Sequence, residues 1–352
     1  MARILLCDYP HPDGDARLRA LTRLGHEVTF FNHSAPALTA SFAAPVRTAT
    51  RSLGPAAQRA RELVSGWLTS RRLLGACARV RPEILLVVKG THLRAPVLRA
   101  IKRRFRPLLV NWFGDSLLTP GVRDFVERDS AAYDFFFIID DARALERVKV
   151  RAGRVATLPF GCDPDFHRPM SLTPEERAVY GSPVAFVGTV IPPRQTVLES
   201  IADFGLKIWG PPCDSRATWT TDGSRLTRCW QGRPAWGVEA VKIYNAADIV
   251  LDIHFLFGAP TPMCNVTARV FEVPACGGFL LTNASEPLER LYVVGREMIC
   301  YRSMHELRGL VAHYLAHPDE RRAIARAGET RARNEHTFED RLREMLRHLG
   351  RA

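Results

Sequence analysis

The stretch Ile84-Leu85-Leu86-Val87-Val88-Lys89-Gly90 shows the pattern that decides the fold. Its apolar residues run without alternation and end at once in a lysine and a glycine. A short continuous apolar run is typical of a parallel strand that helices cover on both faces. Residues 3–8 and 108–113 have the same character, and amphipathic stretches lie between these runs. The first half of the chain therefore predicts parallel βαβ units.

A second series of the same kind follows the first. The expected strands are residues 3–8, 27–31, 84–88, 108–113, 135–140 and 155–160, then 184–188, 206–209, 249–253, 279–282 and 298–301. Helices are expected at 41–81 with a break at Gly54-Pro55, and at 194–204, 237–247, 268–276, 305–317 and 318–350 with a break near 334–337. Residues 211–234 read as a long loop. The two series of strands and helices and the length of the chain predict an α/β protein with two Rossmann-like domains, 1–160 and 184–330, joined by a crossover at 161–183.

Composition excludes several classes of protein. No stretch of the 352 residues approaches the roughly 20 apolar residues that span a bilayer, and the apolar run at the start is too short for a signal peptide, so we expect a cytoplasmic protein. The eight cysteines lack the spacing of disulfide or zinc sites. The net charge of +12 is spread along the chain, which disfavours specific nucleic-acid binding but suits anionic substrates.

The segment from Asn265 to Thr282 carries the most informative polar residues. Asn265, Arg269 and Glu272 are spaced to share one face of a helix, and Gly277 follows at its expected end. A helix N-terminus, an amide and an arginine can hold a diphosphate, while a carboxylate further along can accept hydrogen bonds from ribose hydroxyls. An exposed Arg269–Glu272 ion pair without a ligand is the alternative from spacing alone.

This segment resembles the group-1 glycosyltransferases, and more closely their spore-maturation (CgeB-like) branch, whose stretch reads roughly N-x-R-x-F-E-x-x-A-C-G. In this chain the arginine follows the asparagine by four residues rather than two. The resemblance runs from about residue 84 to the C-terminus. Further matching segments are Lys89-Gly90, Trp112-Phe113-Gly114-Asp115, Pro159-Phe160-Gly161-Cys162-Asp163, Phe186-Val187-Gly188 with Arg194, and Lys242-Ile243-Tyr244-Asn245-Ala246-Ala247.

The resemblance implies the GT-B fold, in which two Rossmann-like domains face each other, a sugar nucleotide binds in the cleft, and a terminal helix, here 331–352, packs back on the N-terminal domain. The C-terminal domain then holds the donor. The implied donor-binding residues are Glu272 for the ribose, Arg194, Arg269 and Asn265 for the diphosphate, Gly188 for close backbone approach, and Tyr244 and Asn245 for the nucleobase side. A buried helix face is the alternative for Tyr244. Many retaining relatives carry a glutamate where this chain has Cys264.

On the N-terminal side, Asp115 and His92 follow predicted strands and are the candidate catalytic residues. Asp115 either acts as general base on an acceptor hydroxyl or caps a helix before Leu117. His92 has the alternative of a solvated or structural loop histidine. Lys89 either attracts an anionic group or caps a strand end. The loop 8–15 lacks a G-x-G-x-x-G pattern and is assigned only to the acceptor side.

We therefore expect a glycosyltransferase that moves a sugar from a nucleoside-diphosphate donor to an unknown acceptor, which could be a protein, glycan, lipid or small metabolite. Transfer is expected without a metal or other cofactor, because arginines can neutralise the leaving diphosphate, and retention of configuration is favoured. Asp163-Pro164-Asp165 matches the letters of a D-x-D metal motif but lies in the crossover, where it reads as a turn. A catalytically silent nucleotide-sugar-binding protein and a sugar-nucleotide epimerase are the alternatives.

Overall fold

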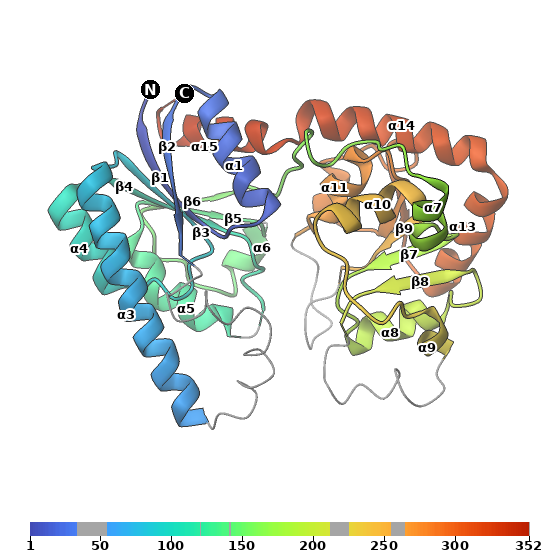
Figure 1. Cartoon of the computed structure of the whole chain (residues 1–352), viewed down its shortest axis with the longest axis horizontal. Coiled ribbons are helices and arrows are strands. Elements are labelled where there is room, and N and C mark those ends of the chain that lie inside the picture. Colours follow the sequence, from blue (N-terminus) through green and yellow to red (C-terminus); the bar gives the residue numbers. More distant parts are fainter. Residues whose placement is uncertain (34–54, 120, 141, 212–224, 255–264, 352) are drawn as a thin grey trace. The chain divides into compact units, whose positions relative to one another are not determined.

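Figure 1 shows the computed structural model, which describes residues 1–33, 55–119, 121–140, 142–211, 225–254 and 265–351. The chain divides into two compact units. Unit 1 consists of Met1–Leu158 together with Leu342–Ala352, and unit 2 consists of Pro159–Arg341. Each unit is an α/β domain built on one parallel sheet, as the apolar runs predict.

The sheet of unit 1 has the order β2-β1-β3-β4-β5-β6. Its strands are β1 (Arg3–Asp8), β2 (Glu27–Asn32), β3 (Ile84–Val88), β4 (Leu108–Phe113), β5 (Phe135–Ile138) and β6 (Arg154–Thr157). Every neighbouring pair is parallel. The strands of this unit agree with the predicted ones except at their ends, where β5 and β6 stop earlier than expected.

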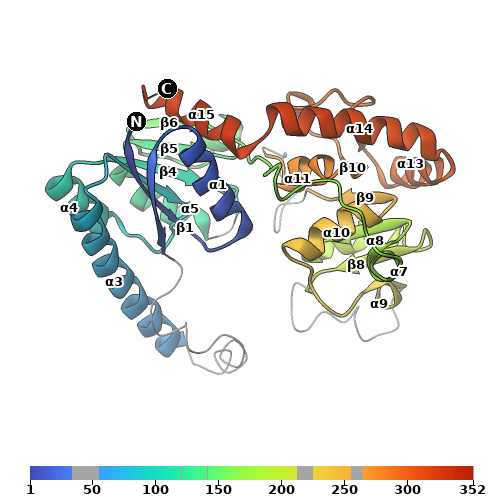
Figure 2. The same ribbon diagram turned by 45° about the horizontal axis from the view of Figure 1, so that its top comes forward.

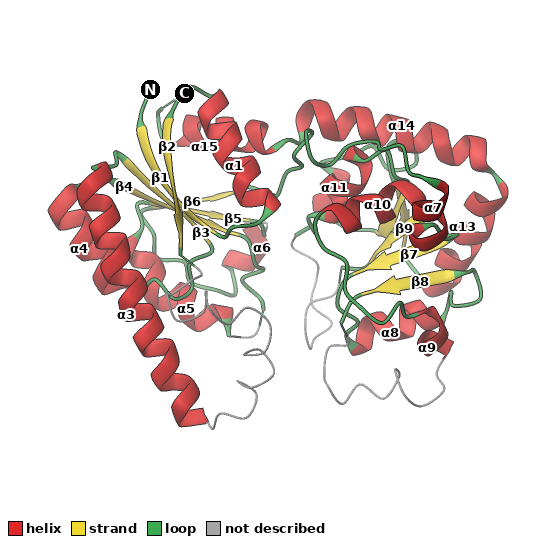
Figure 3. Cartoon of the chain, in the orientation of Figure 1, coloured by secondary structure: helices red, strands yellow, loops and turns green. Residues whose placement is uncertain are grey.

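Helices cover both faces of this sheet, as Figure 3 shows by colour. The unit contains α1 (Pro12–Arg23), α3 (Pro55–Val80), α4 (Ala95–Phe105), α5 (Val122–Asp129), the short η2 (Ser130–Ala132) and α6 (Ala142–Leu145). In the views of Figures 1 and 2, α3 and α4 lie on one side of the sheet and α1 on the other. The last helix, α15 (Phe338–His348), returns to this unit, where the His348 ring lies 5.7 Å from that of Phe137 in β5.

The sheet of unit 2 has the order β11-β10-β9-β7-β8, and its neighbouring strands are again parallel. Its strands are β7 (Val184–Val187), β8 (Leu206–Trp209), β9 (Ile249–Asp252), β10 (Leu280–Asn283) and β11 (Ile299–Tyr301). Its helices are α7 (Pro174–Tyr180), α8 (Pro192–Glu199), α9 (Arg225–Cys229), α10 (Val238–Ala246), α11 (Arg269–Ala275), α12 (Glu286–Glu289), α13 (Met304–Ala316) and α14 (Pro318–Glu335).

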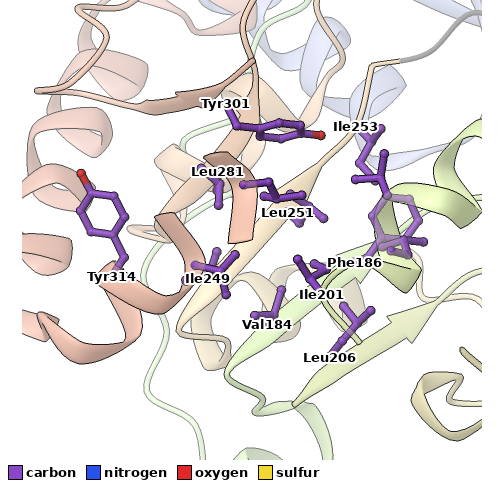
Figure 4. Packing of buried hydrophobic residues seen from close by; sticks show 14 of the residues in the cluster. Val184, Phe186, Ile201, Leu206, Ile249, Leu251, Ile253, Leu281, Tyr301 and Tyr314 are labelled. Carbon is purple, nitrogen blue, oxygen red and sulfur yellow. The ribbon is translucent and has the colours of Figure 1, made fainter. Parts of the chain in front are cut away.

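Alternate residues of the central strand β9 face two separate cores. Ile249, Leu251 and Ile253 pack with side chains of α8, α9 and α13 in the cluster that Figure 4 shows. Val250 packs with side chains of α10 and α11 on the opposite face. A strand buried on both faces has no polar side to show in its sequence, which explains its continuous apolar run.

In each sheet, the order in which successive strands are added changes direction at one place. In unit 1 the chain passes from β1 to β2 on one side and to β3 on the other, and in unit 2 it passes from β7 to β8 and then to β9. Such a switch point separates the helices on the two faces and opens a crevice at the carboxyl ends of the strands, where ligands of open α/β sheets bind. The residues that end β1, β3, β7 and β9 are therefore the places to look for a site.

Two further expectations have clear outcomes. The terminal helical tail breaks between Glu335 and Phe338, as predicted. The expected loop at 211–234 is wrong in part, because Arg225–Cys229 form a helix whose Leu226 and Cys229 side chains are buried. Six of the eight cysteines lie in the described residues and are free thiols; Cys213 and Cys264 lie outside them, as does Gly54. None of the described helices has the length and apolarity needed to cross a membrane.

The two-faced packing of β9 predicts that Leu251→Ala lowers the free energy of unfolding by about 2–5 kcal/mol, because it leaves a cavity in a core where Leu251 is fully buried. Urea unfolding followed by circular dichroism measures this value. Val179→Ala is the control, since Val179 is 52% exposed and its truncation should change stability by less than about 0.5 kcal/mol. Equal effects of the two substitutions would contradict this packing.

Candidate functional site

Gly188 and Arg269 meet at the switch point of unit 2. Gly188 directly follows β7 and has a φ of 153°, and a Cβ atom on it would lie 2.8 Å from Nη2 of Arg269. Gly210, which follows β8, would place a Cβ only 1.8 Å from the Gly188 carbonyl oxygen. Side chains at these two positions would collide with backbone or guanidinium, so both glycines are required by close approach. Gly188 and Arg269, both expected at the donor site, therefore lie side by side, while their contact with a diphosphate stays a prediction.

Asp252, the last residue of β9, fixes the position of Arg269. Its Oδ1 lies 3.3 Å from Nη1 of Arg269, while its Oδ2 accepts a hydrogen bond of 2.7 Å from the Thr267 hydroxyl. Nε2 of His254 also lies 2.7 Å from Oδ2. The Asp252 side chain is fully buried, whereas 20% of the Arg269 side chain is exposed. One carboxylate thus orients a guanidinium, an imidazole and a hydroxyl at the same edge of the sheet.

Asp252 stays ionised in this setting. Burial raises the pKa of its carboxyl, but the charges and hydrogen bonds of His254, Arg269 and Thr267 lower that pKa further, so the net shift is downward. For Arg269, burial disfavours the charged guanidinium, whose pKa is nevertheless raised, chiefly by the charge of Asp252. The two groups therefore form a lasting ion pair with a partly exposed cation.

Glu272 lies in the same helix, α11, and is half-buried. Its Oε2 accepts a hydrogen bond of 3.3 Å from the hydroxyl of Tyr244 in α10. Tyr244 is itself buried, with 3% of its surface exposed, which agrees with the buried helix face that was its alternative. Tyr244 therefore supports the carboxylate of Glu272.

Arg194 binds backbone rather than pointing freely into the site. Its Nε donates to the Ile253 carbonyl at 3.1 Å and its Nη1 to the Thr189 carbonyl at 2.9 Å. Its guanidinium also lies 5.8 Å from the ring centre of Phe186. These contacts connect the loops after β7 and β9, so Arg194 stabilises the edge of the sheet at which Arg269 lies.

Two predicted donor residues lie elsewhere than expected. Asn265 precedes α11, which begins at Arg269, so Asn265 does not share a helical face with Arg269 and Glu272 as the spacing predicted. Asn245 accepts from the Met170 amide at 2.7 Å and donates to the carbonyls of Arg168 and Val241 at 3.1 and 2.9 Å. Its amide anchors the segment before α7, and we do not retain it as a nucleobase contact.

A cavity of about 540 Å³ opens in unit 2 at the carboxyl ends of β10 and β11. Asn283, Ser285, Tyr301 and Ser303 contribute polar groups to its wall. Asn283 also accepts a hydrogen bond of 2.7 Å from the backbone amide of His254, which connects the cavity wall to the Asp252 cluster. Figure 4 shows the Tyr301 hydroxyl directed towards Ile253 at this edge. The volume lies within the range of small-molecule pockets.

His92 and His33 form a histidine pair at the switch point of unit 1. His33 Nδ1 lies 3.1 Å from His92 Nε2, and His33 Nε2 lies 3.1 Å from the Val88 carbonyl oxygen at the end of β3. The Tyr9 ring packs edge-on against His33 with centroids 4.5 Å apart. His92 is thus held in a buried polar contact rather than solvated. His33 was missed by the sequence analysis.

Burial keeps both histidines neutral near pH 7. Desolvation, together with the neighbouring His92, lowers the pKa of His33 to about 4, although Asp8 and the Val88 carbonyl oppose the shift. Desolvation likewise lowers the pKa of His92.

Asp115 pairs with Lys89, its Oδ2 lying 2.6 Å from the lysine Nζ, and about a third of each side chain is exposed. The alternative of a cap before Leu117 is wrong, because the Leu117 amide donates to Oδ2 of Asp140 at 2.6 Å. Lys89 has a φ of 60°, a left-handed conformation that few residues adopt without a cause. The Asp115 carboxylate is therefore partly exposed at the carboxyl edge of the sheet of unit 1, where the Lys89 ammonium group holds it.

Asp8 adds a buried ion pair to this edge, which the sequence analysis also missed. Its Oδ2 lies 2.7 Å from Nε of Arg17, and both side chains are nearly fully buried. The Arg17 guanidinium lies 5.7 Å from the ring centre of Trp112. The signal that could have found Asp8 and Asp252 is shared: each is a charged residue that ends a continuous apolar strand.

Asp163 and Asp165 form the turn expected of them. The Asp165 amide donates to Oδ1 of Asp163 at 3.1 Å, and the His167 amide donates to the Asp163 carbonyl at 2.6 Å. The carboxylate of Asp163 therefore serves local backbone geometry.

The low pKa of His33 predicts a loss of stability in mild acid. Since its pKa lies below the ordinary 6.5 of the unfolded chain, its contribution is present above pH 6.5 and is lost as pH falls towards about 4. Between pH 7.5 and 5 we expect a loss of roughly 2 kcal/mol from this residue. Urea unfolding at both pH values should show a smaller loss in His33→Asn than in wild type, and an unchanged loss in the exposed-site control His305→Asn. Equal losses in wild type and His33→Asn would contradict the assignment.

The buried carboxylate predicts a second effect. Asp252→Asn leaves the Arg269 guanidinium without its counter-charge and should lower the free energy of unfolding by about 3–5 kcal/mol. Asp203→Asn removes the partner of Arg308 from an exposed ion pair and should cost less than about 1 kcal/mol. Thermal unfolding of both variants tests the contrast, and a neutral Asp252→Asn would show that the pair contributes nothing.

Comparison with known proteins gives matches in sequence and in structure. Residues 194–347 match the family described as Glycosyl transferase-like. The chain is 31% identical over 111 residues to spore protein CgeB of Bacillus subtilis (strain 168), a match that covers 29% of this chain and 33% of that protein. The chain therefore spans about a third of the length of this curated relative. The family match includes α11 with Arg269 and Glu272, and agrees with the expected glycosyltransferase.

Two solved structures resemble the chain along its length. The sucrose-phosphate synthase of Thermosynechococcus elongatus has a TM-score of 0.64 at 13% identity, with 99% of both chains covered. Anabaena Alr3699/HepE in complex with UDP-glucose has a TM-score of 0.63 at 13% identity, with 100% of both covered. At such identities the likeness establishes the fold. The chain has the GT-B fold of two Rossmann-like domains, and its residues 194–347 are similar to the Glycosyl transferase-like family.

Proposed function

We propose that the chain is a glycosyltransferase of the CgeB-like branch, in which unit 2 binds a nucleoside-diphosphate sugar and unit 1 binds the acceptor. The observation that carries this proposal is Arg269, held by buried Asp252 beside Gly188 at the switch point of a glycosyl transferase-like region. Solved GT-B structures with UDP and UDP-glucose add support from the fold. The partial identity to spore protein CgeB supports the branch.

Arg269 has the properties that a leaving diphosphate requires. Breaking the bond from the anomeric carbon to oxygen leaves negative charge on the diphosphate, and a preoriented cation stabilises that charge without reorganising. Asp252 supplies the orientation, and Gly188 keeps side-chain atoms away from Nη2. A guanidinium also offers several N–H donors to phosphate oxygens.

Glu272 is the proposed ribose contact. A carboxylate accepts two hydrogen bonds from adjacent hydroxyls, and the Tyr244 hydroxyl holds Oε2 in place at 3.3 Å. The alternative, an exposed Arg269–Glu272 ion pair, has less support because Arg269 pairs with Asp252 instead.

Asp115 and His92 are the proposed acceptor-side residues. Both follow strands of unit 1 at its carboxyl edge, and both carry groups that can accept a proton from a hydroxyl. Lys89 places a cation beside Asp115 and can attract an anionic acceptor or donor phosphate.

Transfer without a metal is part of the proposal, because guanidinium and lysine charges are available where phosphate charge develops. Retention of configuration stays a prediction, and the anomeric configuration of the product tests it. The nucleobase, the sugar and the acceptor are to be found by screening UDP-, GDP-, dTDP- and CMP-sugars by thermal shift, since a bound donor raises the unfolding temperature.

Isothermal titration with UDP-glucose, or with another donor that the screen selects, tests the donor site. Arg269→Gln and Glu272→Gln should each weaken binding at least about tenfold, the scale of one lost charge-assisted contact. Arg308→Gln, which alters an exposed ion pair, is the matched control and should bind as wild type. Near-wild-type affinity of both site variants would reject the assignment.

Incubation with the donor alone distinguishes a glycosyltransferase from a sugar-nucleotide epimerase. With the donor alone, a glycosyltransferase leaves the configuration of the donor sugar unchanged. After an acceptor extract is added, it releases nucleoside diphosphate. Conversion of the donor to its epimer without acceptor would contradict transfer, and binding without turnover under any acceptor would favour the silent alternative.

A further inference from the structure

The histidine pair of unit 1 determines where its protons lie. The Val88 carbonyl can only accept, so Nε2 of His33, 3.1 Å away, must carry the proton of that hydrogen bond. His33 is 1% exposed, and because it is neutral, its Nδ1 has a lone pair. A hydrogen bond between two nitrogens needs one N–H, which His92 Nε2 must therefore supply across 3.1 Å.

These constraints fix the state of His92. A neutral imidazole carries one proton, and His92 uses it at Nε2, so its Nδ1 is left with a lone pair. Among the described residues, the His92 ring has its hydrogen bonds with His33, at the ring Nδ1 and at the backbone carbonyl. His92 is only half-buried, unlike His33. The residue therefore combines a fixed tautomer with a nitrogen able to accept a proton.

We propose that His33 is a positioning residue, which holds His92 in the tautomer with an unprotonated Nδ1 so that His92 takes the proton of the acceptor hydroxyl. The proposal rests on the glycosyl transfer proposed above. In the step, the acceptor O–H proton moves to His92 Nδ1, the acceptor oxygen bonds to the anomeric carbon, and the bond from that carbon to its leaving oxygen breaks. His92 later returns the proton to solvent. The role applies to a single displacement and to the second step of a double displacement, because in each of them the attacking hydroxyl loses its proton to a base.

The charged groups around the pair are themselves engaged. Asp8 acts on His33 through its charge but pairs with Arg17 at 2.7 Å. Asp115 pairs with Lys89 at 2.6 Å. Tyr9 packs against His33, and burial raises the pKa of its phenol, so Tyr9 stays neutral at pH 7. Among the described groups that act on it, His33 is therefore the one that hydrogen-bonds the His92 ring.

Nuclear magnetic resonance of the full chain with ¹⁵N-labelled imidazoles tests the proposal without any substrate. At pH 7.5 we expect His92 with Nε2 protonated and Nδ1 bare, and His33 in the same tautomer and unprotonated down to about pH 5. Single His→Asn variants assign the signals. A protonated His92, or one with its proton on Nδ1, would overturn the proposal.

Two substitutions of His33 form a matched pair. His33→Phe keeps an aromatic ring against Tyr9 but removes the Nδ1 acceptor, so His92 should exchange between its two tautomers. His33→Asn offers an amide oxygen near the place of Nδ1 and should keep the wild-type His92 signal. Circular dichroism checks that both variants fold. The positioning role would be overturned by an unchanged His92 tautomer in folded His33→Phe, and equally by loss of that tautomer in folded His33→Asn.

Turnover of the donor that the thermal-shift screen selects, measured with an acceptor extract, supplies the second readout. His33→Phe should lower kcat about tenfold with KM within about twofold, and should change the acidic limb of the kcat profile, whereas His33→Asn keeps most of kcat. His305→Asn, at an exposed site in unit 2, is the control. Equal kcat in wild type and His33→Phe would contradict the role. Absence of turnover in wild type, with the tautomers as expected, would count against the proposed function and leave the histidine geometry intact.

Discussion

The buried carboxylate of Asp252 is the constraint on which the proposed donor site depends. It ends the central strand of unit 2, where backbone position is fixed by sheet hydrogen bonds on both sides. From there it holds Arg269, Thr267 and His254 at once. A charge at full burial is tolerated only when its partners compensate for lost solvation. The arrangement therefore keeps a cation oriented at the edge of the sheet before any ligand arrives.

Both units repeat one arrangement with different chemistry. In each, a carboxylate ends a central strand at the switch point and pairs with an arginine, Asp8 with Arg17 and Asp252 with Arg269. The arginine of unit 1 is nearly fully buried, whereas that of unit 2 is one-fifth exposed. The same fold position is thus structural in unit 1, where the histidine pair lies nearby, and open to an anion in unit 2. This difference is consistent with the proposal that unit 1 binds the acceptor and unit 2 binds the diphosphate of the donor.

The fold follows closely from the sequence because both sheets are parallel and buried. Strands such as 84–88 and 108–113 show their limits as apolar runs, the second interrupted only by Asn111, and the structure reproduces them. Short amphipathic pieces were harder to find: Arg225–Cys229 lies among proline, glycine and serine residues that masked it as a loop. The shared face of Arg269 and Glu272 was predicted, but the start of α11 was not, so Asn265 was placed on a helix that it precedes.

The candidate site could be predicted only in part from the sequence. Local spacing indicates residues of one helix, whereas the partners of Arg269, His92 and Asp115 come from strands distant in sequence. His33 could be named only from the fold, because its ring reaches the Val88 carbonyl at the end of β3 although β1 lies between β2 and β3. Asn245 shows the reverse error, since an amide in a family motif serves the backbone of residues 168–170. The family resemblance identified the relevant segments of the sequence, whereas the packing of the folded chain determines which contacts their side chains make.

The donor site proposed for unit 2 depends on recognition of a diphosphate by Arg269. It is tested by comparing the dissociation constants of a nucleoside diphosphate and the matching monophosphate, UDP against UMP or the pair of whichever base binds, for wild type and Arg269→Gln. We expect wild type to prefer the diphosphate at least about tenfold, and the variant to lose this preference while its affinity for the monophosphate changes little. A preference of equal size in both proteins would show that Arg269 does not bind the second phosphate.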